Sequence, residues 1–233
     1  MRREEEEKKV AQRVTECNTE HNGRMLPLQD LQLVTMPASQ IRDLRALRHL
    51  NAYHNKIEAL PTALWTFLPD LQIIDLSQNQ LVFLPQELFE LEKLRELNVS
   101  QNKLAMLPDN VGKAITLTHL CLAHNKLRVL PESLGELLDL TELDVSFNQL
   151  IEMPHSSAHL ERLEVVDLSG NKIGYVPESI KRLHDRRMLL HSRTKRKELI
   201  SRALRVRTKV SLQCQRELQA QSLRAVEEAS QET

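Results

Sequence analysis

Aromatic side chains, glycine and cysteine are all scarce in this chain of 233 residues. Aromatics make up 3%, and there are five glycines, nine prolines and three cysteines, Cys17, Cys121 and Cys214. An odd, widely spaced set of cysteines makes no disulfide framework. So few glycines and prolines also exclude a collagen-like or glycine-rich low-complexity chain. We therefore expect a folded protein with free thiols.

Long apolar runs are missing as well. No stretch approaches the ~20 residues that a membrane-spanning helix needs, so we expect no transmembrane segment. The chain begins MRREEEEKK, with charges where a signal peptide has its apolar core. These features predict a soluble, cytoplasmic protein, with the nucleus as a second location.

The charges cancel over the whole chain but are unevenly distributed. Residues 1–23 carry 5 Lys/Arg and 6 Asp/Glu, residues 24–183 carry 15 and 20, and residues 184–233 carry 12 and 6. An acidic body is therefore followed by a basic tail. Such an asymmetry bears on the partners of a protein rather than on its fold.

A pattern of 23 residues repeats along the acidic body. Counted from Leu71, apolar residues stand at positions 1, 4, 6, 11 and 14, asparagine at position 9 and proline at position 15. The register returns in units that begin at residues 47, 71, 94, 117, 140 and 163, with one extra residue before 71. A degenerate unit, residues 24–46, precedes them and lacks the asparagine. Six asparagines in one register indicate a solenoid of stacked units.

Each fixed position has a physical reason. Alternation at positions 4 and 6 predicts a short strand with one buried face, and stacking aligns these strands in a parallel sheet. The Leu-Pro pair turns the chain onto the outer face, where residues such as Leu88 and Leu134 close the core. In the unit from 140, Ser157 stands at such a position, so we expect Ala158 to rotate inward or the unit to pack poorly. The asparagine amides satisfy backbone groups of adjacent turns, which predicts a structural ladder of Asn55, Asn79, Asn102, Asn125, Asn148 and Asn171.

These residues resemble the leucine-rich repeat family, in particular the 23-residue Leu-Pro-x-x-Leu-x-x-Leu repeats of Ras-suppressor, erbin, densin and scribble-type proteins. The resemblance spans about residues 24–185. It implies an α/β fold, a right-handed horseshoe solenoid with a parallel concave sheet that binds other proteins inside the cell. It also implies small-GTPase or phosphatase signalling partners, without selecting one.

The two flanks predict helical caps. In residues 1–23, Val10, Val14 and Cys17 share one helical face and Asn22-Gly23 provides a stop, so we expect a charged capping helix. Residues 186–233 predict a basic helical cap and tail, because apolar residues recur there at helical spacing from Leu199 onward. The pattern leaves open whether residues 186–192 form a final edge strand.

The candidate binding surface consists of the side chains between the buried leucines. It is acidic, with small residues at position 7 and large side chains near its two ends. Solvated strand positions are polar in any case, but exposed aromatics are typical of binding hot spots. The predicted partner-binding residues are Tyr53, His54, Asp75, Glu96, His119, Cys121, Glu142, Asp144, Phe147 and Asp167. With no disulfide, we expect Cys121 to react with alkylating reagents in the native protein.

Catalytic and metal chemistry have weak support in the sequence. His119, Cys121 and His124 cluster, but no tight ligand pair of the structural zinc type occurs. An open sheet excludes no water from a nucleophile, and no phosphate-binding loop or dinucleotide fingerprint is present. We therefore expect no enzymatic activity, no metal and no cofactor.

The basic tail has three interpretations. Arg193, Lys195, Arg196 and Lys197 form its densest part and are consistent with a solvated helix face or a nuclear address. The third interpretation is contact with nucleic acid, an anionic membrane or a calmodulin-like protein. Nucleic acid is disfavoured because no aromatic residue follows position 181. The predicted function is that of a non-catalytic interaction adaptor or regulatory scaffold in signalling, and the alternative is a nuclear or nucleic-acid-associated protein acting through this tail.

Overall fold

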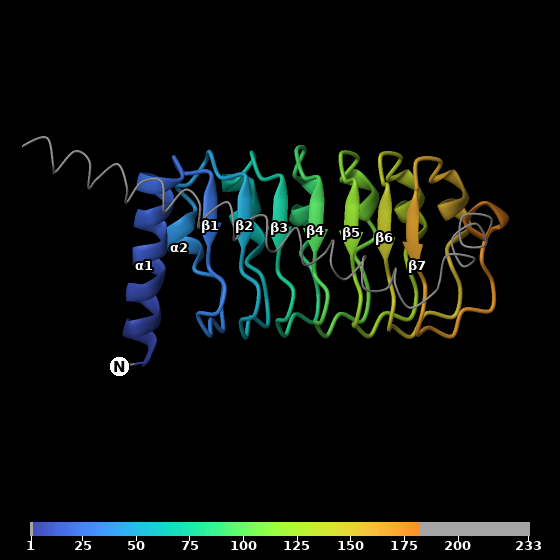
Figure 1. Ribbon diagram of the computed structural model, residues 1–233, viewed down its shortest axis with the longest axis horizontal. Coiled ribbons are helices and arrows are strands. Elements are labelled where there is room, and N and C mark those ends of the chain that lie inside the picture. The colour runs from blue at the N-terminus through green and yellow to red at the C-terminus, as the bar shows by residue number, and fades with distance from the viewer. Residues whose placement is uncertain (1, 182–233) are drawn as a thin grey trace, which may run out of the picture. The chain divides into compact units, whose positions relative to one another are not determined.

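Seven short strands form one parallel sheet in residues 2–181, the part of the chain that this computed structural model describes. The strands follow one another in chain order (Figure 1), and each pairs with the next at the same repeat position, as Leu97 does with Leu120. The predicted parallel sheet and stacked repeat architecture are confirmed. The strands are β1 (Met25–Pro27), β2 (His49–Asn51), β3 (Ile73–Asp75), β4 (Glu96–Asn98), β5 (His119–Cys121), β6 (Glu142–Asp144) and β7 (Val165–Asp167).

Short helices cover the outer side of the sheet. The first is α2 (Ala38–Ile41), and the later units use 3-10 turns that begin directly after the Leu-Pro or Met-Pro pair, except in the unit from 94, where the turn begins at Val111, three residues after Pro108. Their inward residues, including Leu88 and Leu134, are fully buried. These turns are η1 (Thr62–Phe67), η2 (Gln86–Glu90), η3 (Val111–Lys113), η4 (Glu132–Glu136) and η5 (His155–His159).

Ser157 occupies its inward position without help from Ala158. The serine is fully buried, and its hydroxyl donates a 2.6 Å hydrogen bond to the carbonyl of Pro154. Ala158 is exposed. The expectation that Ala158 would rotate inward is therefore wrong, because the local backbone carbonyl satisfies the serine hydroxyl and removes the cost of burying it.

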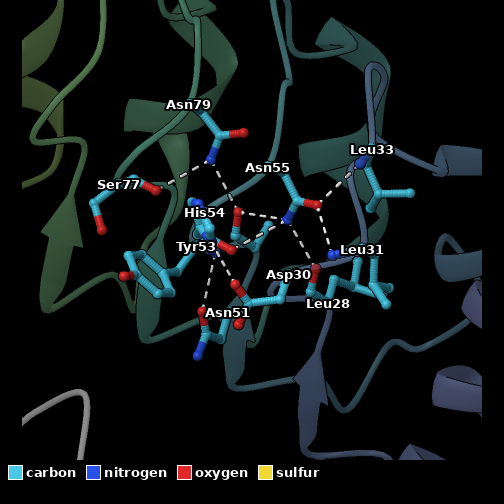
Figure 2. A network of polar contacts seen from close by, with 11 residues as sticks. Leu28, Asp30, Leu31, Leu33, Asn51, Tyr53, His54, Asn55, Ser77 and Asn79 are labelled. Atoms are coloured by element: carbon cyan, nitrogen blue, oxygen red, sulfur yellow. Dashed lines mark hydrogen bonds and ion pairs between the residues drawn. The ribbon is translucent and has the colours of Figure 1, made fainter.

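The asparagine at position 9 joins neighbouring units. Figure 2 shows Asn55 accepting hydrogen bonds from the backbone N–H groups of Leu31 and Leu33, at 3.1 and 3.0 Å. Its amide nitrogen donates to the carbonyls of Leu28 and Ala52, at 2.8 and 3.0 Å. The equivalent asparagines of the later units make the same kind of bonds across unit boundaries. Each side chain thus replaces the hydrogen bonds that a turning, buried backbone would otherwise lack.

The N-terminal helix α1 (Arg2–Glu20) lies beside β1 at one end of the sheet (Figure 1). Val10 and Cys17 are buried on its inward face, and Val14 packs partly against the same core. The helix ends at Glu20; Asn22 and Gly23 follow it with positive φ, and the Gly23 N–H donates to the carbonyl of Cys17 at 2.9 Å. This bond is typical of a glycine-terminated helix.

No described helix is both long and apolar enough to cross a membrane. The predicted C-terminal cap and tail, residues 186–233, lie outside the described residues, as does the question of a final edge strand at 186–192.

Candidate functional site

The open face of the sheet is lined by the residues at positions 3 and 5. In β2 to β6 the central leucine or isoleucine is buried while its two neighbours are half-buried, so the neighbours point away from the core. Seven of the ten predicted binding residues lie on these strands and on β7. They are Asp75, Glu96, His119, Cys121, Glu142, Asp144 and Asp167.

The aspartates and asparagines at position 5 also hold the turn that follows each strand. A side-chain oxygen of Asp144 accepts the backbone N–H of Ser146 at 2.9 Å, and Asp75 accepts that of Ser77 at the same distance. The equivalent bonds recur at Asn51, Asn98 and Asp167. Each is an Asx turn. The acidic ladder is therefore partly structural, a role that the recurring Asp/Asn-x-Ser pattern signals in the sequence but that reasoning about solvated positions missed.

The small residues at position 7, predicted as part of the binding surface, are largely buried in the central units. Ser77, Ser100, Ala123 and Ser146 are buried. In these four central units position 7 lies against the neighbouring unit. At the two ends of the stack, Tyr53 is half-buried and Ser169 is exposed at the same position. The accessible surface of the central units is accordingly narrower than predicted and consists of positions 3, 5 and 8.

Burial changes the acidity of two groups in the centre of this face. Burial raises the pKa of the Cys121 thiol to about 12, and the nearby charge of Asp144 adds to the effect. Burial also raises the pKa of Asp144, against the hydrogen bonds that it accepts from Ser146. The Cys121 thiol is therefore less reactive than its position on an open strand face indicates.

Native Cys121 is expected to resist alkylation, contrary to the sequence-based expectation. A pKa of about 12 in place of 9.0 lowers the thiolate fraction at mildly alkaline pH roughly a thousandfold, and the thiolate is the nucleophile. Peptide mass spectrometry after treatment with iodoacetamide should show slow labelling in buffer and rapid labelling in guanidinium. Equal rates in the two solvents would contradict this environment for the thiol.

Position 8 carries the large side chains at the rim of the face. Asp30, His54, Gln78, Gln101, His124 and Phe147 all adopt a positive φ, and Gly170 stands at the same position of the last unit. A bulky residue such as phenylalanine is rare in this left-handed region. Here the turn demands that conformation in every unit, so it belongs to the repeat rather than to one residue.

Phe147 is held from both sides. Its ring stacks on that of His124 with centroids 4.4 Å apart and an interplanar angle of 5°. On the other side, a Cβ added at Gly170 would stand 2.7 Å from the Phe147 Cδ1, so only glycine leaves room for the ring. Phe147 remains 37% exposed. This arrangement is a rigid, pre-organised aromatic at the rim of the face.

Two further predicted binding residues with ring side chains, Tyr53 and His54, lie near the opposite end of the sheet. Tyr53 and His54 follow β2, with ring centroids 5.6 Å apart. The His54 Nδ1 pairs closely with the Asp30 carboxylate of the preceding unit (Figure 2). Four unit steps separate this pair from Phe147, so the ten predicted residues form a band along the sheet rather than a single pocket.

His119, Cys121 and His124 each face a different neighbour: the first two lie near carboxylates of the following unit, and His124 stacks on Phe147. His119 Nε2 lies 3.8 Å from Glu142 Oε1, and the Cys121 Sγ lies 3.8 Å from Asp144 Oδ2. Among residues 2–181, no group of three or more His, Cys, Asp or Glu side chains converges on a point where a metal ion would fit. Arg193, Lys195, Arg196 and Lys197 of the basic tail lie outside the described residues.

Comparisons with known proteins agree with this geometry. The chain is 40% identical over 74 residues to podocan-like protein 1 of Mus musculus, an alignment that covers 30% of this chain and 13% of that protein. It superposes on a leucine-rich repeat protein of Leptospira interrogans with a TM-score of 0.63 and 30% identity, over 73% of this chain and 49% of the other. For the leucine-rich repeat domain of APL1B the TM-score is 0.60 at 26% identity, over 67% and 47%.

The chain thus spans about half, or less, of the length of these relatives. The family model described as "Leucine rich repeat" matches residues 45–104, 93–150 and 115–173, which together cover more than half of the chain. Domains of this family generally bind other proteins and are typically not catalytic. The register, the asparagine bonds and these matches lead to one conclusion: the protein belongs to the leucine-rich repeat family.

Proposed function

We propose that this protein is a non-catalytic adaptor or regulatory scaffold that binds a partner protein along the open face of its sheet, which we call the concave face. The observation that carries the proposal is the fixed aromatic at the rim, Phe147, beside an acidic band. An aromatic that is already immobilised loses little conformational entropy on binding, which is a property of interface hot spots.

The charge of the face defines the kind of partner. Positions 3 and 5 of the described strands hold Glu96, Glu142, Asp75, Asp144 and Asp167 but no lysine or arginine. A partner with a basic or mixed surface would be steered toward this face, and the effect would weaken as salt screens the charges.

The proposed compartment is the cytoplasm. Cys17 and Cys121 are free thiols, which fits a reducing environment. The resemblance to Ras-group repeats makes small GTPases and phosphatase subunits the first partner classes to examine. Proximity labelling in cells with the full chain would recover the partner.

Phe147→Gln is expected to weaken binding of the recovered partner about tenfold or more, mainly through faster dissociation. Glutamine occupies the same left-handed position in two other units, as Gln78 and Gln101, so the variant should fold normally. Surface plasmon resonance measures both rate constants. Ile115→Ser is the matched control, because Ile115 is 63% exposed away from the sheet.

The acidic band is tested separately in the same assay. Glu96→Gln with Asp144→Asn removes two charges. The asparagine keeps a side-chain oxygen that can accept the Ser146 N–H, so the turn after the strand is preserved. Association should slow and lose salt sensitivity. If the Phe147 variant and the charge variant both bind like the parent, the concave face is not the binding site. Binding by a chain truncated before residue 184 would then test whether the basic tail is the site.

A further inference from the structure

A second exposed surface is formed by side chains of the loops that follow the strands; Figure 1 shows the course of these loops. Positions 12 and 13 of these loops carry apolar side chains that are 50–62% exposed, although the adjacent positions 11 and 14 are buried. We name them the lateral strip; its members are Val82, Phe83, Met106, Val129 and Ile151. Four consecutive units contribute to it.

The loops that carry the strip are regularly stacked. The N–H of Lys103 donates to the carbonyl of Leu81 at 2.8 Å, and that of Lys126 donates to Leu104 at the same distance. One unit further on, the N–H of Gln149 donates to Leu127. Hydrogen-bonded parallel neighbours stand about 4.8 Å apart, so the strip runs for about 15 Å from its first unit to its fourth. It is continuous because its loops are bonded to each other.

A row of lysines runs beside the strip at position 10. The lysine row is defined as Lys56, Lys103, Lys126 and Lys172, all of them exposed. Lys103 and Lys126 stand in the two central units of the strip, Gln80 and Gln149 occupy position 10 in its outer units, and Lys56 and Lys172 lie one unit beyond each end. Lys103 donates to the Gln80 side chain of the preceding unit at 2.8 Å, so the side chains at position 10 reach along the row. Arg128, at position 12, adds a further exposed positive charge.

The lysine row differs from the other basic residues of the stack. On the outer side, Lys93, Lys113 and Arg162 each pair with a carboxylate one unit away, namely Asp70, Glu90 and Asp139. Within residues 2–181, none of the four row lysines has a carboxylate within ion-pair distance. The row therefore places uncompensated positive charge beside the centre of the strip and one unit beyond each of its ends.

We infer that the lateral strip and the lysine row together form a second docking surface, which takes an extended polypeptide segment with alternating acidic and apolar side chains. Side chains of an extended segment alternate between its two sides. A segment that lies along the boundary between the row and the strip can therefore direct its carboxylates to the lysines and its apolar side chains to the strip. Both follow the stack axis, so the two sets of contacts form together.

An anionic membrane fits this surface less well. Glu58 and Glu152 stand at positions 12 and 13, at the two ends of the strip, and the acidic concave face follows immediately on the other side of the turn. A broad anionic surface would meet these carboxylates as well as the lysines, whereas a narrow segment avoids them. The favoured occupant is thus a polypeptide.

The test uses the full chain and a fluorescein-labelled peptide of repeated Glu-Leu-Glu-Phe, with fluorescence anisotropy as the readout. The parent should bind it with an affinity that falls as salt is added. Met106→Ser with Val129→Ser should reduce that affinity about tenfold, and Lys103→Gln with Lys126→Gln should remove most of the salt dependence. The matched control, Ile115→Ser with Leu138→Ser, changes two equally exposed apolar residues elsewhere and should bind like the parent.

Several outcomes would overturn the inference. They are a failure of the parent to bind the peptide, equal binding by the parent and the Met106/Val129 variant, or equal binding of a Glu-Ser-Glu-Ser peptide that lacks the apolar side chains. Binding to phosphatidylcholine–phosphatidylserine vesicles in place of the peptide would assign the surface to a membrane. A parent dimer that the Met106/Val129 variant dissociates in sedimentation would assign it to a second copy of the chain.

Discussion

Gly135→Ala is expected to destabilise the protein by on the order of 3 kcal/mol or more. Gly135 is buried in η4, and a Cβ built on it would stand 2.3 Å from the Ser156 carbonyl oxygen and 2.5 Å from the carbonyl carbon. Both atoms belong to the backbone of the next unit and cannot move aside without separating the two units. Overpacking of this kind costs more when the obstacle is backbone than when it is a flexible side chain.

Thermal and urea denaturation followed by circular dichroism measure this cost. Gly112→Ala should behave similarly, because its Cβ would stand 2.4 Å from the Ser133 carbonyl oxygen. Gly174→Ala is the matched control, since its nearest neighbour, the Ile151 carbonyl oxygen, is 4.0 Å away. A midpoint for the Gly135 variant as high as that of the Gly174 variant would show that the units are not so closely spaced.

Asn102→Ala is expected to cost about 3 kcal/mol. The Asn102 side chain accepts from the Leu81 N–H at 2.9 Å and donates to the carbonyls of Leu76 and Val99, both at 3.0 Å. Truncation leaves buried backbone groups of two units without partners, and each such group costs about 1–3 kcal/mol before relaxation. Asn125→Ala should act similarly, because it makes the same bonds one unit later.

Two control variants test whether the cost depends on the buried position 9 rather than on the loss of any asparagine. Asn98→Ala removes one bond, to the Ser100 N–H at 3.1 Å, and should cost about 1 kcal/mol. Asn171→Ala should cost less than Asn102→Ala, since Asn171 is only partly buried and water can replace its bonds. Equal denaturation midpoints for all these variants would contradict a structural role for position 9.

The sequence predicted the fold well because its signals are local and repeated six times. Leucines at positions 4 and 6 define a strand with one buried face. The proline at position 15 marks where the chain turns onto the outer side of the sheet. Repetition of the same register in every unit then requires parallel pairing, as between Leu120 and Leu143. No long-range information was needed, because each unit contacts mainly its neighbours.

The surface was harder to predict because exposure depends on backbone geometry. Position 7 lies against the neighbouring unit in the central units, which hides its serines, and the Asx turns give aspartates such as Asp144 a second role. Position 19 shows the same limit on the outer side: it holds the buried Trp65 and Phe89 in two units but Gly112 and Gly135 in the next two. A repeat register does not reveal how closely two units approach.

The candidate site was predictable from the sequence only in part. Exposed polar positions of the strands were predictable from alternation, but the stacking of Phe147 between His124 and Gly170 joins three units and has no signature within one. The lateral strip was not predicted either, because the exposure of positions 12 and 13 between buried positions 11 and 14 depends on the backbone of the loop.

Carboxyl footprinting of the complex with the recovered partner tests the central claim most directly. A water-soluble carbodiimide with glycine ethyl ester labels exposed carboxylates, and peptide mass spectrometry quantifies the labelling with and without partner. We predict that Glu96, Glu142 and Asp167 on the sheet become protected, while Glu87 and Glu90 on the outer helix η2 are labelled equally in both states. Protection of the η2 residues with unchanged labelling of the three sheet residues would contradict binding at the concave face.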